Sequence, residues 1–244
     1  MVVFALAAAS GLWLVVVSPS LDIQATYDLN LAAKQMLNGE SFPPEILDGI
    51  AAKSAPVLEA QPCNFLGFQD LAIIRSAQLE NAIVANDSNA ADRLSSQASD
   101  AAKKSLVCNP MSVVSWTILA WVEFLQNDDT PRLRSLLDMS FRAGPFEGWS
   151  LLRRVELQLH ILPTLDNSSI EQLKRQINWL IARGLVEVPA QLYLSAGPQQ
   201  QAYLRNLLAE SPEEVQKRAE QIVWNSGGNI ALPLARQRGS RPWN

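Results

Sequence analysis

The stretch PMSVVSWTILAWVEFLQNDDTPRLRSLLDMSFRAGP, residues 110–145, decides the fold class of this chain. Its apolar residues recur at steps of three and four, first over residues 113–126 and again over residues 131–142. That spacing places them on one face of an α-helix. Pro131 and Pro145 suit the first turns of new helices, and Gly144 suits the end of one. The stretch therefore predicts two helices joined by a short turn.

Helical periodicity continues outward from this stretch in both directions, and strand signals are nearly absent. Pro43-Pro44, Asp87-Ser88 and Asp166 are typical helix starts. The predicted helices span residues 21–38, 44–59, 65–85, 89–107, 113–126, 131–142, 146–161, 168–183, 188–195, 198–209 and 212–224. We expect the very apolar residues 113–126 at the centre of the core and the small, polar residues 89–107 to face water. The result is an all-α body over residues 21–224, followed by an irregular basic tail over residues 225–244.

The first seventeen residues carry no charge, and Ser18-Pro19-Ser20 ends this run. A helix of that length reaches roughly 26 Å, close to the thickness of the hydrocarbon core of a bilayer. Residues 1–18 are therefore predicted to form an uncleaved transmembrane anchor. A cleaved signal peptide remains open, because Ser18-Pro19-Ser20 offers small residues at the −3 and −1 positions, and so does a buried core helix. The first basic residue is Lys34, so the basic flank usual for a signal peptide is missing, and no charge directs the orientation of an anchor.

Cys63 and Cys108 are the two cysteines of the chain, and each lies beside a proline that marks a loop. An even number of cysteines in an exported chain predicts one disulfide bond. The bridge would close a loop of about 45 residues and stabilise the fold by roughly 4 kcal/mol. It would also indicate an oxidising compartment such as a periplasm. Two unrelated buried thiols are the alternative.

Pro110 and Pro145 lie 35 residues apart, and each stands between one helix pair and the next. This spacing is close to the period of about 34 residues in the tetratricopeptide repeat. On that template, Trp116, Leu119 and Ala120 occupy the aromatic, leucine and small-residue positions of a first helix. The chain therefore resembles a tetratricopeptide-repeat protein.

The neighbouring helix pairs, 65–85 with 89–107 and 146–161 with 168–183, would be the repeats on either side. Glu123 stands where tyrosine is usual, so the array is degenerate. The fold class that we predict is a transmembrane helix followed by a helical-repeat array of antiparallel helix pairs. A generic α-helical bundle is the alternative.

A narrower resemblance rests on WTILAW at residues 116–121, LLDMSFRAGPFEGW at residues 136–149, and Arg153-Arg154. Over about residues 60–185 the chain resembles small membrane-anchored helical-repeat proteins of Gram-negative bacteria that accompany polysaccharide polymerisation and export machinery. The resemblance implies an accessory role in the cell envelope and no catalytic residues.

Composition and motifs exclude several classes of function. A net charge of −4 disfavours binding of nucleic acid. The chain has no nucleophile elbow, no P-loop and no dinucleotide-binding glycine pattern. One histidine, His160, and two cysteines cannot assemble a zinc site. We therefore expect no metal and no cofactor.

Glu147, Trp149, Arg153 and Arg154 are the candidate contacts to a partner or a glycan, because arginine and exposed tryptophan favour protein interfaces and sugar faces. A buried tryptophan beside a local ion pair is the alternative, since Glu147 falls in the first turn of a helix. Glu40 is the candidate catalytic carboxylate if the protein is instead a muralytic-type, glycan-acting enzyme.

The function that we expect is a non-catalytic periplasmic scaffold at the bacterial inner membrane, attached through residues 1–18. Its partners would be membrane or periplasmic proteins, such as a polymerase, ligase or exporter of exopolysaccharide or O-antigen. A structural subunit of a large membrane complex is a further alternative, because Gly11 and its small neighbours allow close approach of membrane helices.

Overall fold

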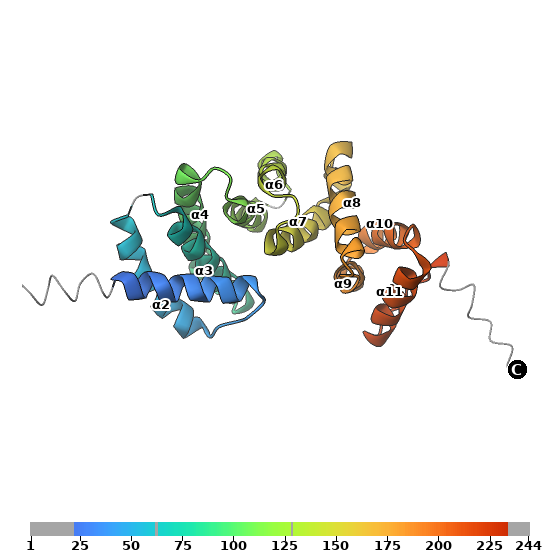
Figure 1. The fold of residues 1–244 in the computed structure, drawn as a ribbon, viewed down its shortest axis with the longest axis horizontal. Helices are drawn as coiled ribbons and strands as arrows, with labels where there is room; N and C mark the ends of the chain where they lie inside the picture. Colours follow the sequence, from blue (N-terminus) through green and yellow to red (C-terminus); the bar gives the residue numbers. More distant parts are fainter. Residues whose placement is uncertain (1–21, 62, 128, 234–244) are drawn as a thin grey trace, which may run out of the picture. The chain divides into compact units, whose positions relative to one another are not determined.

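The computed structural model describes residues 22–61, 63–127 and 129–233, and over these residues it is helical with no strand. The first helix spans residues 22–37. It is followed by α2 (Pro44–Glu59), α3 (Phe65–Val84), α4 (Ser88–Cys108), α5 (Val113–Asn127), α6 (Pro131–Ala143), α7 (Gly148–His160), the 3₁₀ turn η1 (Leu162–Thr164), α8 (Asn167–Ala182), α9 (Glu187–Ser195), α10 (Pro198–Ala209) and α11 (Glu213–Asn225) (Figure 1). The all-α prediction is confirmed, and the predicted helix bounds agree with these to within two residues.

The predicted anchor, residues 1–18, lies outside the described residues. In the part of the chain that the structure describes, no helix combines the length and the apolar character needed to cross a membrane. The predicted tail, residues 225–244, is described only as far as residue 233.

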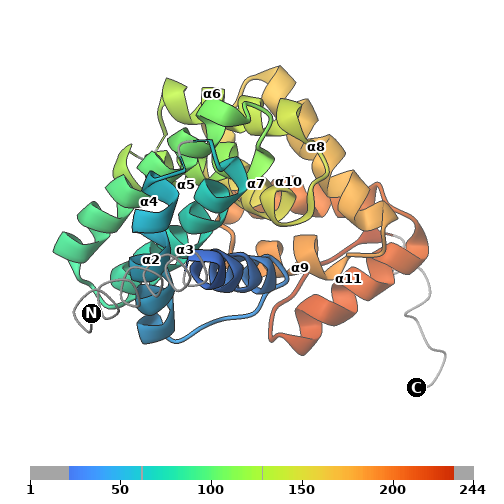
Figure 2. The ribbon, with the colours of Figure 1, turned by 60° about the vertical axis from the view of Figure 1, so that its left-hand side comes forward.

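The chain divides into two compact units, the first ending at Gly144 and the second beginning at Pro145. In the first unit, α3 and α4 form a hairpin, α5 and α6 form another, and α4 also packs on α5 (Figures 1 and 2). In the second unit, α7 packs on α8, and α9 packs on both α10 and α11. The boundary coincides with the Gly144-Pro145 junction that the sequence places between two helix pairs.

The interior of the α3–α4 hairpin depends on small side chains of α4. Ala98, Ala101 and Ala102 are buried, and their size lets the backbone of α4 approach that of α3 closely. The expectation that this helix faces water is therefore wrong for its alanine face. The opposite face, with Asp92 and Arg93, is exposed.

Helix α5 lies in the core, as predicted, but its aromatic residues do not form the centre. Ile118, Leu119 and Ala120 are buried, whereas Trp116 and Trp121 are only half-buried. Trp116 donates from Nε1 to the carbonyl oxygen of Pro110 at 2.8 Å. This tryptophan therefore fixes the loop that leads into α5.

Helix ends follow the capping residues seen in the sequence. The side chains of Asp87, Thr130 and Asp166 each accept a hydrogen bond from the backbone N–H three residues on, at 2.8–3.0 Å. Gly39 and Gly184 have φ angles of +92° and +80°, in the left-handed region that glycine adopts without strain. They stop the helix of residues 22–37 and α8.

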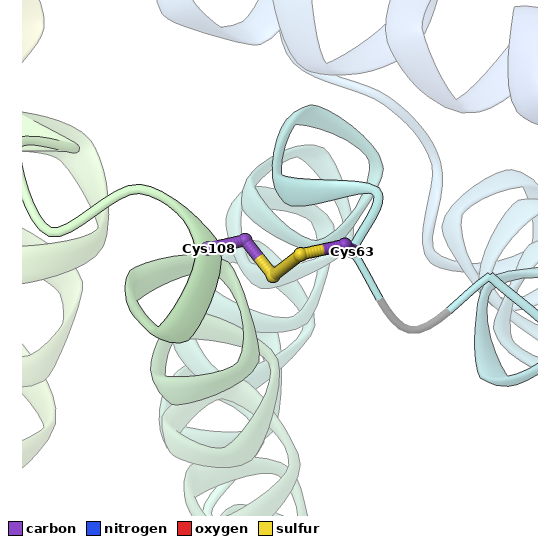
Figure 3. The surroundings of a disulfide bond; sticks show 2 residues. All are labelled: Cys63 and Cys108. Atoms are coloured by element: carbon purple, nitrogen blue, oxygen red, sulfur yellow. A yellow bond between two sulfur atoms is a disulfide. The ribbon is translucent and has the colours of Figure 1, made fainter.

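A disulfide bond joins Cys63, in the turn before α3, to Cys108, the last residue of α4 (Figure 3). The two Cα atoms are 5.6 Å apart, and the residues are separated by 45 positions in the chain. The predicted pairing is confirmed. The bond connects the start and the end of the α3–α4 hairpin, so it holds closed the open end of that hairpin.

Two polar contacts attach the first helix to the rest of its unit. The hydroxyl of Ser54 in α2 donates to the carbonyl oxygen of Ala25 at 3.0 Å. Asn30 donates from Nδ2 to Oδ2 of Asp70 in α3 at 2.8 Å. Burial raises the pKa of the Asp70 carboxyl to about 6, although the hydrogen bond from Asn30 lowers it.

Candidate functional site

The candidate contact residues at the start of α7 have very different surroundings. Arg154 is completely buried. It donates from Nε to Oε1 of Gln176 in α8 at 2.9 Å, and from Nη2 to the carbonyl oxygen of Pro145 at 2.7 Å. Gln176 then donates from Nε2 to Oε1 of Gln158 at 2.8 Å. Arg154 therefore joins α7 to α8 and, contrary to expectation, offers no surface to a partner.

The charge of Arg154 interacts with the carboxylate of Glu147. Burial lowers the pKa of its guanidinium to about 10, and the carboxylate of Glu147 acts in the opposite direction. A group with that pKa remains protonated at neutral pH. Glu147 itself is exposed and stands at the N-cap of α7, where its side chain makes no capping hydrogen bond. Of the four candidates, Glu147 is the most accessible.

Arg153 and Trp149 form a local cluster on α7. The Arg153 guanidinium carbon lies 5.7 Å from the centroid of the Trp149 ring, and its Nη1 is 3.3 Å from Oε2 of Glu156. Trp149 is half-buried, and the side chain of Arg153 is 19% exposed. The alternative from the sequence is a buried tryptophan beside an ion pair of Glu147; Trp149 is instead half-buried, and Arg153 pairs with Glu156.

A second aromatic cluster, which the sequence did not single out, lies in the same unit. Phe146 stacks on Trp179 with ring centroids 5.3 Å apart, and the guanidinium carbon of Arg183 lies 5.2 Å from the centroid of the Trp179 ring. Phe146 is 41% exposed, and Arg183 is exposed. Aromatic rings with an adjacent cation are common in protein and sugar contacts. Phe146 belongs to the GPFEGW motif, but no sequence period connects it to Trp179.

The other two residues weighed for chemistry are both exposed. His160 ends α7, where its Nδ1 lies 2.9 Å from the carbonyl oxygen of Glu156, and it lines a cavity of about 90 Å³ together with residues of α9 and the start of α10. Glu40 lies in the turn between the first helix and α2. A catalytic glutamic acid is typically buried in an apolar cleft, whereas Glu40 is exposed.

Among the described residues, no three histidine, cysteine, aspartate or glutamate side chains are grouped so that they could hold a metal ion. The geometry thus defines an all-α protein with a disulfide-closed hairpin in its first unit and exposed aromatic and charged residues at the start of its second. Comparisons with protein-family models, with curated proteins and with solved structures find no match.

Proposed function

We propose that the protein is a non-catalytic accessory subunit of a bacterial cell-envelope assembly. Residues 1–18 anchor it in the inner membrane, and its helical body lies in the periplasm. It acts through contacts with other proteins, such as the polymerase, ligase or exporter of an exopolysaccharide or O-antigen. The observation that carries the proposal is the Cys63–Cys108 disulfide.

The disulfide supports the location. Disulfides persist in oxidising compartments and are rare in the cytosol, where thiols are kept reduced. The bond lies in the unit that directly follows the uncharged residues 1–17. An apolar N-terminal segment and an oxidised body are together typical of a protein that is inserted in, or passed across, a bacterial inner membrane.

Consecutive helix pairs support the mode of action. The pairs α3–α4, α5–α6 and α7–α8 follow one another along the chain. Arrays of such pairs present extended surfaces, and they bind other proteins more often than they catalyse reactions. The spacing of 35 residues between Pro110 and Pro145 supports a degenerate tetratricopeptide-like array.

An apolar stripe on the first helix supports attachment close to the membrane. Ile23, Tyr27 and Leu31 recur every four residues and are 69%, 61% and 43% exposed. Leu29 and Ala33, on the other face, are fully buried. The stripe begins five residues after Ser18, which limits their separation to about 18 Å. If residues 1–18 are in the membrane, the stripe is therefore close enough to contact the membrane surface or a membrane protein beside the anchor.

Co-purification tests the partner. The tagged full-length protein is expressed at native level, extracted in mild detergent, and its bound proteins are identified by mass spectrometry. Recovery of a polysaccharide polymerase, ligase or exporter supports the proposal, and a partner-free monomer contradicts it. Exchange of residues 1–17 for an unrelated transmembrane helix is the control: retained partners mean that the anchor only tethers the body.

Thiol labelling tests the location. The protein is denatured without reductant directly from cells and treated with an alkylating reagent. Neither Cys63 nor Cys108 is expected to react unless a reductant is added first. Labelling of both thiols without reductant would remove the main support for a periplasmic body.

A further inference from the structure

A pocket of about 220 Å³ lies wholly within the first unit, between α2, α3 and α4. Its polar lining consists of Glu59 from α2, Arg75 from α3, and Gln97, Asp100 and Lys104 from α4. The apolar lining residue Phe68 is 2% exposed, and Lys104 lies 5.5 Å from the centroid of its ring. The ring of Phe68 is therefore not accessible to a ligand, and a ligand in this pocket would contact mainly polar side chains.

Arg75 is the cation of this pocket that forms no direct ion pair within the described residues, although the Asp48 carboxylate is close enough to act on its charge. It is half-buried and donates from Nη1 to Oε1 of Gln78, a neutral amide, at 2.9 Å. Gln78 in turn donates to Asp48. Among the described residues, Arg75 makes no ion pair with any carboxylate. The other N–H groups of the Arg75 guanidinium are therefore available to a ligand.

A second arginine increases the positive charge beside the pocket. Arg93 of α4 is exposed and makes no ion pair with the residues that the structure describes. Burial and the charge of Arg93 both lower the pKa of Arg75, and only Asp48 acts in the opposite direction. Because Arg93 repels Arg75 and neither guanidinium forms an ion pair within the described residues, an anion bound at Arg75 would relieve this repulsion.

Gln97 contributes an unused acceptor. Its Oε1 atom is shielded from water and has no hydrogen-bond partner among the described residues. A buried acceptor without a donor is unfavourable, because the atom has lost its water and gained nothing in exchange. A ligand with an O–H or N–H group in the pocket would satisfy it.

The remaining charged side chains of the pocket are already partnered by lysines. Glu59 forms an ion pair with Lys104, and Asp100 lies 3.7 Å from Lys103. Their carboxylate oxygens still accept further hydrogen bonds. The pocket thus offers one unpaired guanidinium and three acceptor side chains, which is complementary to a ligand with one acid group and several hydroxyls.

We infer that this pocket binds a carboxylate-bearing saccharide, a uronic acid unit, whose carboxylate pairs with Arg75 and whose hydroxyls donate to Gln97 and Asp100. The paired geometry of guanidinium and carboxylate makes arginine well suited to this contact. The inference depends on the pocket alone. It adds a glycan ligand to the proposed accessory role and would stand if the partner proteins proved to be different.

Calorimetric titration of the full-length protein in mild detergent tests the inference. The probes are a galacturonic acid trisaccharide, the neutral galactose trisaccharide of the same length, sodium acetate and a triglutamate peptide. We expect the acidic trisaccharide to bind at least about tenfold more tightly than the neutral one, because an ionic hydrogen bond is lost in the latter. Equal affinities for the two saccharides, or no binding of the acidic one, would overturn the inference. Tighter binding of triglutamate would replace the saccharide by an acidic peptide.

Three variants locate the site. Arg75→Met keeps an unbranched apolar stem and removes the charge, so affinity for the acidic trisaccharide should fall about tenfold or more. Gln97→Leu removes the acceptor and should weaken binding of both saccharides while preserving the preference for the acid. Arg205→Met, on an exposed residue of α10, is the matched control and should bind like the wild type. If Arg75→Met and Gln97→Leu bind the acidic trisaccharide as tightly as the wild type does, the proposed site is wrong. If Arg75→Met fails to fold, the affinities of the wild type for the four probes still test the inference.

Discussion

Replacing the buried carboxyl of Asp70 by an amide should stabilise the first unit at neutral pH. Asp70 is 6% exposed, and its hydrogen-bond partner Asn30 is a neutral side chain. Burial raises the pKa of its carboxyl from 3.8 to about 6, so the folded state disfavours the charged form. In Asp70→Asn, the amide oxygen can still accept the hydrogen bond from Asn30. The variant keeps the contact and loses the buried charge.

The size of the effect follows from the two pKa values. Between about pH 4 and pH 6, the folded state binds more protons at Asp70 than the unfolded state does, so stability falls as pH rises through this window. The pKa values differ by about 2, and each pKa unit corresponds to about 1.36 kcal/mol, which gives an upper limit of roughly 3 kcal/mol above pH 6. Asp70→Asn should therefore gain about 1–3 kcal/mol at pH 7.5 and close to nothing at pH 4.

Hydrogen exchange followed by mass spectrometry measures this difference in stability between Asp70→Asn and the wild type, on the full-length protein. Slower exchange of α3 amides in Asp70→Asn at pH 7.5, with a difference that shrinks towards pH 4, is the expected result. Asp92→Asn, an exposed carboxylate on α4, is the control and should show no such pH dependence. A variant that is less protected than the wild type at pH 7.5, or equally changed at both pH values, would refute the reasoning.

Three further predictions concern stability. Replacing both Cys63 and Cys108 by serine should lower the free energy of unfolding of the first unit by about 4 kcal/mol, measured by urea unfolding against the oxidised wild type, and a loss below about 1 kcal/mol would contradict the loop-closure argument. Arg154→Ala should destabilise the second unit by about 3–5 kcal/mol in the same assay, whereas Arg153→Ala should cost at most about 1 kcal/mol; equal effects would contradict the internal role of Arg154. Glu123→Leu should cost about 1–3 kcal/mol and increase amide exchange in the turn between α5 and α6, because two hydrogen-bond donors lose their acceptor, and unchanged exchange there would contradict this.

Local signals were sufficient for the helices. Asp87, Thr130 and Asp166 each satisfy a backbone N–H of the first turn, so side-chain chemistry alone fixes where these helices begin. Gly39 and Gly184 fix two of the ends by their positive φ angles. These features depend on residues within one helical turn, and the sequence displays them directly. The disulfide joins residues 45 positions apart, but its pairing is also evident from the sequence, since two cysteines allow a single intramolecular pairing.

The environment of the candidate site needed tertiary information. Leu151, Arg154, Val155 and Gln158 share one face of α7 by their spacing of three and four, and all four are buried. The helical period thus places Arg154 on the buried face. Arginine is seldom buried, however, so its residue type indicates an exposed position. Arg154 can be buried because Gln176 on α8 accepts a hydrogen bond from it, and no local sequence pattern indicates this acceptor. Burial of a charge is set by the partner that another helix brings to it.

Glu123 shows that a charged residue in the middle of an apolar helix can have a structural reason. Although it is charged, Glu123 is only 7% exposed. Its Oε1 accepts from Thr130 at 3.0 Å and from Asn127 at 3.2 Å, and its Oε2 lies 3.3 Å from Nε of Arg132. Since Thr130 also caps α6, the carboxylate orients the residue that starts the next helix. An apolar residue would fill the space but would leave the Thr130 hydroxyl without this acceptor, so the turn between α5 and α6 depends on a buried charge.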